Sequence, residues 1–140
     1  MSDEFAIQQT ISRYAEGASR ADWAQVLSTY MPDGVWEITS FGAKFEGHKA
    51  IQDGLRQFCD PMDYIVQLNG PALIQMKGDT ATARSVIREC GKYAGRDQAL
   101  EVLGFYADKL LRTQDGWKFT HRVFELRGMH SFPLSPPAGA

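Results

Sequence analysis

The residue best suited to acid–base chemistry in this sequence is one carboxylate, Glu89. It lies in a predicted strand that starts near Thr80, where strand alternation groups it with Ala81, Ala83, Ser85 and Ile87 on one face. If that face lines a pocket, loss of water raises the pKa of the carboxyl group and makes it a proton acceptor near neutral pH. The alternatives are an ion pair with an arginine of an adjacent strand, or a slipped register at a β-bulge.

Tyr14 is a candidate hydrogen-bond donor on a predicted helix. It shares a helical stripe with Ile7, Ile11 and Ala18, so its hydroxyl group points into the interior and needs a partner there. That partner is either one group of the core or the oxygen atom of a substrate. Together with Glu89, this pattern suits proton abstraction beside a carbonyl, with the oxyanion held by Tyr14.

Two further residues are candidates for proton transfer. Asp108 shares a strand face with Val102, Tyr106 and Leu110. His121 has the same parity as Trp117, Phe119 and Val123, which makes it a pocket base or, as we favour, a core histidine satisfied by one backbone contact. For the polar and aromatic surface of a substrate site, the candidates are Gln67, Asn69, Trp36, Phe58 and Tyr106.

These residues require an α+β fold to bring them together. Helices are predicted from a cap at Ser2 or Asp3, from a cap at Asp22, and over about His48 to Phe58. A turn at residues 31–34 precedes a hairpin of two short strands, Val35 to Thr39 and one around Phe45. Beyond Asp63 the chain predicts long strands, separated by turns at residues 77–79, 95–97 and 114–116. Three N-terminal helices should therefore pack on one face of an antiparallel sheet.

Size and composition narrow the possible classes of function. The 140 residues, 44% of them hydrophobic and 23% charged, suit one packed domain, which we place at residues 1–132 with a Pro-rich tail at 133–140. The net charge of -2 gives no basic surface for nucleic acid. The acidic N-terminus lacks the pattern of a signal peptide, and no stretch approaches a membrane span, so we expect a cytoplasmic location and no membrane partner.

The cysteines predict no metal site. Cys59 and Cys90 form no CxxC pair and have no histidine at ligand spacing, so buried thiols are the better interpretation. We expect chemistry without a metal or another cofactor.

Several short motifs resemble the SnoaL-like branch of the nuclear-transport-factor-2-like, ketosteroid-isomerase-like superfamily. The similarity spans nearly the whole chain, and its motifs are Arg13-Tyr14, Arg20-Ala21-Asp22-Trp23, residues 45–51, residues 78–84, residues 105–109, Asp115-Gly116-Trp117-Lys118-Phe119 and His121-Arg122. The resemblance implies a strongly curved, mostly antiparallel sheet that forms a cone around an internal pocket. It also supports a homodimer, because a sheet face free of helices is usually buried against another copy.

The resemblance also suggests roles for individual residues. Ketosteroid isomerases and related dehydratases have a tyrosine at the place of Tyr14 that donates to the substrate oxygen. A dehydratase-type member has its catalytic aspartate at the place of Glu89, and an acid near Asp108 stabilises the enolate in ketosteroid isomerases.

Departures from the family exclude two of its catalytic types. Members with an Asp-His pair have the aspartate where this chain has Ser19 and the histidine where it has Gln67. Neither side chain can act as a general base at neutral pH. The general-base aspartate of ketosteroid isomerases aligns with Ile38, so that arrangement is missing too.

The leading expectation is therefore a cofactor-free lyase or isomerase for a small hydrophobic cyclic, polyketide-like or steroid-like molecule, with Glu89 as base and Tyr14 as oxyanion donor. Because fold analogy alone cannot choose a function, two alternatives stay open. One is a non-catalytic domain that binds an apolar ligand or a partner. The other is a β-subunit-like partner of a ring-hydroxylating oxygenase.

Overall fold

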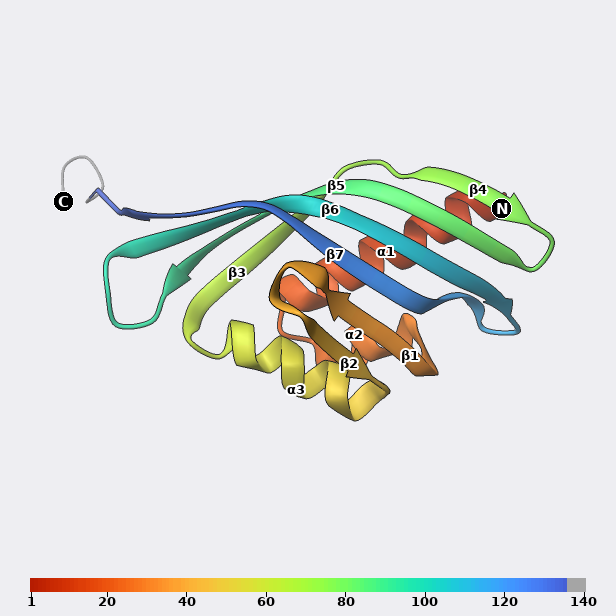
Figure 1. The fold of residues 1–140 in the computed structure, drawn as a ribbon, viewed down its shortest axis with the longest axis horizontal. Coiled ribbons are helices and arrows are strands. Elements are labelled where there is room, and N and C mark those ends of the chain that lie inside the picture. The colour runs from red at the N-terminus through yellow and green to blue at the C-terminus, as the bar shows by residue number, and fades with distance from the viewer. Residues whose placement is uncertain (136–140) are drawn as a thin grey trace.

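The computed structural model describes residues 1–135 and has an α+β architecture (Figure 1). The helical elements are α1 (Asp3–Ser19), α2 (Trp23–Ser28), the short 3-10 helix η1 (Thr39–Phe41) and α3 (His48–Cys59). The strands are β1 (Tyr30–Ile38), β2 (Ala43–Glu46), β3 (Met62–Asn69), β4 (Leu73–Lys77), β5 (Thr80–Tyr93), β6 (Gln98–Thr113) and β7 (Gly116–Pro133). Within residues 1–135, no helix combines the length and apolar character needed to cross a membrane.

The helices begin where the sequence predicts. The Ser2 side chain accepts a hydrogen bond from the backbone N–H of Phe5 and caps α1, and Asp22 does the same for Gln25 at the start of α2. The apolar stripe of α1 is buried against the sheet, because Ile7, Ile11 and Tyr14 are all fully buried. Figure 1 shows α1 lying under the long strands β5, β6 and β7.

The sheet is large and open. Its strand order is β2-β1-β7-β6-β5-β3, with β4 paired to β5, and all pairs are antiparallel except the parallel pair β1–β7. The α+β class, the N-terminal helices and the mostly antiparallel sheet are confirmed, whereas the cone around a pocket stays a prediction. The turn predicted at residues 31–34 is wrong, because these residues form an irregular part of β1.

The end of the chain extends the sheet. β7 ends at Pro133, where the predicted tail begins, and the backbone N–H of Leu134 still donates to the carbonyl of Asp97. Residues 136–140 of that tail lie outside the described residues.

Candidate functional site

A small cavity of about 110 Å³ lies between the sheet and α3. Its wall is largely aliphatic and aromatic, and its lining includes Glu89, the only ionisable carboxylate among the lining residues. The other lining side chains with polar atoms or a thiol are Trp36, Cys59, Gln67 and Tyr106. An apolar wall with few polar groups is the usual composition of a small-molecule site.

Four neighbouring strands hold one row of residues across this cavity. Gln67 pairs with Glu89, Glu89 with Val102, and Val102 with Met129, so the row runs from β3 through β5 and β6 to β7. All four residues line the cavity. The carboxylate is therefore positioned by hydrogen-bonded strands rather than by a loop.

The surroundings of Glu89 favour a proton acceptor. Burial raises the pKa of its carboxyl group to about 7, although the positive charge of Arg122 opposes that rise. The side-chain amide of Gln67 donates a hydrogen bond to Glu89 Oε1 at 2.9 Å and fixes its orientation. The predicted face of Glu89 is confirmed, since Ala81, Ala83, Ser85 and Ile87 are all buried on that side of β5.

Ser19 and Gln67, the two positions that the resemblance predicts for an Asp-His pair, are in contact. The backbone N–H of Gln67 donates to Ser19 Oγ at 2.8 Å, and Ser19 Oγ donates to the carbonyl of Ala15 at 2.8 Å. The contact joins α1 to β3 without any titratable group. The acidic side chain next to this contact is on the neighbouring strand β5, where Glu89 pairs with Gln67.

Tyr14 is not among the residues that line the cavity. Its ring packs edge-on against Tyr30, Tyr106 and Phe119 at centroid distances of 6.0–6.1 Å. Its hydroxyl group is buried and has no hydrogen-bond partner within residues 1–135, and burial raises its pKa to about 12. Tyr106 is the tyrosine that lines the cavity.

Asp108 forms a buried ion pair with Arg122. Its carboxylate oxygens accept from Arg122 Nε at 2.8 Å and Nη2 at 3.3 Å, and both side chains are 0% exposed. Neither residue lines the cavity. The guanidinium carbon of Arg122 lies 3.7 Å from the ring centroid of Tyr106, so one aromatic ring separates this pair from the cavity wall. The predicted face of Asp108 is confirmed, but its carboxylate is already paired.

The predicted face of His121 is wrong. The register of β6 and β7 shifts here: Lys109 pairs with His121, but the next residue, Leu110, pairs with Phe119. Thr120 is therefore an extra residue in β7, a β-bulge. Without the bulge, His121 would share the buried face of Phe119. With it, Arg122 points inward instead, and His121 does not line the cavity. The His121 ring contacts Glu37 Oε2 at 2.8 Å, not a core carbonyl.

The remaining candidates divide between the cavity and its surroundings. Trp36, Phe58 and Gln67 line the cavity. Ile38, which the resemblance aligns with the general base of ketosteroid isomerases, also lines it and has no titratable group. Asn69 does not line it and donates instead to Ser85 Oγ at 2.9 Å.

The lining also contains residues that the sequence analysis missed. Phe41, Cys59 and Met129 reach the cavity from η1, α3 and the second half of β7. No periodic pattern distinguishes them, because they lie at element ends or beyond a bulge. Burial, followed by the nearby Glu89 charge, raises the pKa of the half-buried Cys59 thiol to about 11, so this cysteine stays protonated.

Gly104 makes room for part of this wall. A Cβ atom at this position would lie 2.7 Å from Phe124 Cζ and 2.4 Å from the carbonyl oxygen of Glu125. Glycine therefore lets the Phe124 ring lie against β6 beside Tyr106, where the two centroids are 5.3 Å apart.

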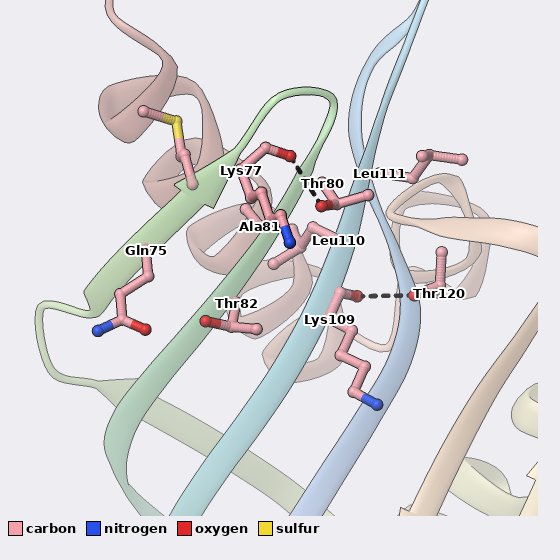
Figure 2. A pocket seen from close by; sticks show the side chains of 10 residues that line it. Gln75, Lys77, Thr80, Ala81, Thr82, Lys109, Leu110, Leu111 and Thr120 are labelled. Atoms are coloured by element: carbon pink, nitrogen blue, oxygen red, sulfur yellow. Dashed lines mark hydrogen bonds between the residues drawn. The ribbon is translucent and has the colours of Figure 1, made fainter.

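A second hollow of about 450 Å³ lies on β4, β5 and β6, and is more open (Figure 2). Gln75, Thr82 and Lys109 project from these strands around it, and its lining contains no acid or histidine. It therefore offers no proton acceptor. Within residues 1–135, no cluster of His, Cys, Asp and Glu has the arrangement of a metal site.

The sequence model of the SnoaL-like domain family matches residues 1–123. The chain belongs to the SnoaL-like family. An uncharacterized protein of Mycobacterium tuberculosis is 25% identical to this chain over 124 residues, which cover 88% of this chain and 84% of the relative.

Solved structures share the fold of this SnoaL-like protein. A Novosphingobium aromaticivorans protein named as an aromatic ring hydroxylase has a TM-score of 0.84 at 24% identity, covering 93% of each chain. The type 2 hexachlorocyclohexane dehydrochlorinase LinA has a TM-score of 0.83 at 17% identity, covering 95% of this chain and 93% of that one. A second N. aromaticivorans protein, named as a scytalone dehydratase, has a TM-score of 0.79 at 19% identity, covering 96% and 93%. At these identities the likeness establishes the fold.

Proposed function

We propose that this SnoaL-like protein is a cofactor-free lyase or isomerase acting on a hydrophobic cyclic, polyketide-like or steroid-like substrate. The observation that carries the proposal is one carboxyl group, Glu89, with a pKa raised to about 7 at the wall of an apolar cavity. In support, solved structures that share the fold are named as a dehydrochlorinase and a dehydratase, and both names denote elimination reactions.

In the proposed reaction, Glu89 removes a proton from the carbon beside a carbonyl group. The electron pair of the C–H bond moves into the bond to the carbonyl carbon, and the carbonyl oxygen becomes an enolate oxygen. An isomerase returns the proton from Glu89 to another carbon, whereas a lyase expels a leaving group from the neighbouring carbon. After an isomerisation, Glu89 is again deprotonated. In a lyase, protonated Glu89 passes its proton to the leaving group or to water.

Tyr106 is our proposed donor to the enolate oxygen, in place of Tyr14. It lines the cavity, and burial raises the pKa of its hydroxyl group well above 10, so the phenol keeps its proton for donation. Tyr14 packs edge-on against the Tyr106 ring and supports its orientation.

The test of the base is Glu89→Gln, which keeps the shape of the side chain and removes its basicity. The assay measures by NMR the rate at which deuterium from D₂O enters the position beside the carbonyl group in a panel of cyclic ketones. We expect this rate to fall by about 10²–10⁴-fold in Glu89→Gln. Glu125→Gln on the opposite, exposed side of the sheet is the control and should exchange at the wild-type rate.

Equal exchange by wild type and Glu89→Gln would contradict the role of Glu89. Ligand binding without exchange, unchanged in Glu89→Gln, would instead favour the non-catalytic binding domain.

We also propose a homodimer formed by the face of the sheet opposite α1. On this face Val86 of β5 pairs with Phe105 of β6, and their side chains are 60% and 40% exposed. The exposed Val66 and Leu68 of the neighbouring strand β3 extend this apolar surface. Contiguous exposed apolar side chains of this kind mark contact surfaces. Val86→Asp should yield monomers in sedimentation experiments at concentrations where wild type and Ser12→Asp, changed on the exposed side of α1, are dimers. A wild-type monomer would contradict the dimer.

A further inference from the structure

The cavity has room for part of a substrate only. Its volume of about 110 Å³ is somewhat below the roughly 150 Å³ of an apolar cavity that holds one benzene ring, so at most one ring enters it, and not completely. A polyketide-like or steroid-like molecule would therefore extend beyond it, and some other surface must contact the remainder.

Three apolar side chains lie where the cavity meets solvent. Phe41, Phe58 and Met129 all line the cavity, yet they are 51%, 46% and 47% exposed. They come from three separate elements, η1, α3 and β7, and we call them the apolar rim. Large apolar side chains that combine cavity contact with solvent exposure are available to bind a ligand that emerges from the cavity.

The rim also has the geometry of an aromatic contact surface. The rings of Phe41 and Phe58 are stacked, with an interplanar angle of 18° and centroids 6.5 Å apart. Phe58 meets Trp36 edge-on at 6.1 Å, and Trp36 stacks on Phe45 at 5.0 Å. A continuous series of rings thus leads from the buried Trp36 outward to Phe41, and the exposed part of the outer rings is suited to contact with a further planar ring.

We propose that the substrate contains at least two rings, of which one enters the cavity and the next is held by the apolar rim of Phe41, Phe58 and Met129. This inference rests on the proposed function of the same cavity and adds a substrate class to it. The rim selects for length and planarity, while Glu89 lies inside at the first ring.

The experiment compares phenol, with one ring, and 2-naphthol, with two, as ligands of the wild type, Phe41→Ser and Phe5→Ser. Dissociation constants come from NMR titration, and the methyl signal of Met129 reports binding at the rim. Phe5 on α1 is 53% exposed and lines no part of the cavity, so Phe5→Ser is the matched control.

We expect Phe41→Ser to weaken 2-naphthol binding by about five- to tenfold, since the ligand would cover the exposed half of that ring, and to leave phenol nearly unchanged. Phe5→Ser should match the wild type for both ligands, and Phe58→Ser should repeat the selective loss. Unchanged 2-naphthol affinity in Phe41→Ser, or equal losses for the two ligands, would overturn the rim contact and leave the cavity proposal standing. Failure of both ligands to bind the wild type would contradict the cavity as a substrate site and the rim with it.

Discussion

Glu89 and Asp108 are two acids on the same face of the sheet, on the adjacent strands β5 and β6, with opposite surroundings. Asp108 is fully buried and accepts two hydrogen bonds from the Arg122 guanidinium. Glu89 lines a cavity and accepts one hydrogen bond from the neutral amide of Gln67. Burial raises the pKa of both carboxyl groups, but only Asp108 has a cation in direct contact.

The difference separates a structural acid from a chemical one. A buried carboxylate bound at both oxygens by a guanidinium is committed to that partner, so it stabilises the fold only while the partner remains. A carboxylate held by an amide beside an apolar cavity exchanges its proton near neutral pH and can reach a ligand. Three measurements test this contrast, beginning with the largest expected effect.

Removing Asp108 should be the most damaging change. Asp108→Leu leaves the guanidinium of Arg122 buried without its counter-charge, and we expect the free energy of unfolding to fall by about 3–5 kcal/mol in urea denaturation. The double variant Asp108→Leu with Arg122→Met replaces both charges by apolar groups and should recover much of the loss.

The control for this effect is Asp53→Leu, which breaks an exposed ion pair with Lys49 and should leave the urea midpoint nearly unchanged. A double variant as unstable as Asp108→Leu alone would show that the pair is not the source of the cost.

Glu89 should make stability depend on pH in a definite direction. The folded state binds the proton of Glu89 with a pKa of about 7, whereas the ordinary value is 4.5, so deprotonation favours the unfolded chain. This contribution to the free energy of unfolding is fully present below about pH 4.5 and is lost as the pH rises through 7, a total of about 3 kcal/mol.

Glu89→Gln cannot lose that proton, so it should gain stability relative to the wild type between pH 5 and 8, measured by urea denaturation at each pH. Glu125→Gln should keep the wild-type profile. If the free energies of unfolding of wild type and Glu89→Gln differed by a constant amount across this pH range, Glu89 would not titrate near neutral pH, and its contrast with Asp108 would be wrong.

The sequence predicted the strand face of Glu89 correctly because β5 alternates without interruption from Ala81 to Glu89. The same rule failed for His121, because the bulge at Thr120 adds one residue and reverses the faces of β7. Helix caps at Ser2 and Asp22 are local signals and were visible in the sequence.

Contacts between distant segments were not visible in the same way. The parallel pairing of β1 with β7 and the rim residue Met129 depend on elements far apart in the chain. Tyr14 shows the remaining gap: its helical face was predicted, but only the packed structure shows that it is not among the residues lining the cavity, whereas its neighbour Tyr106 is.

The most direct test of the contrast is the pKa of Glu89 itself, measured by NMR titration of ¹³C-labelled carboxyl groups and assigned with Glu89→Gln. We expect a titration midpoint near pH 7 for Glu89, well above the ordinary value of 4.5. A midpoint near 4.5 would show that Glu89 is an ordinary solvated carboxylate, and would contradict its proposed role as the base.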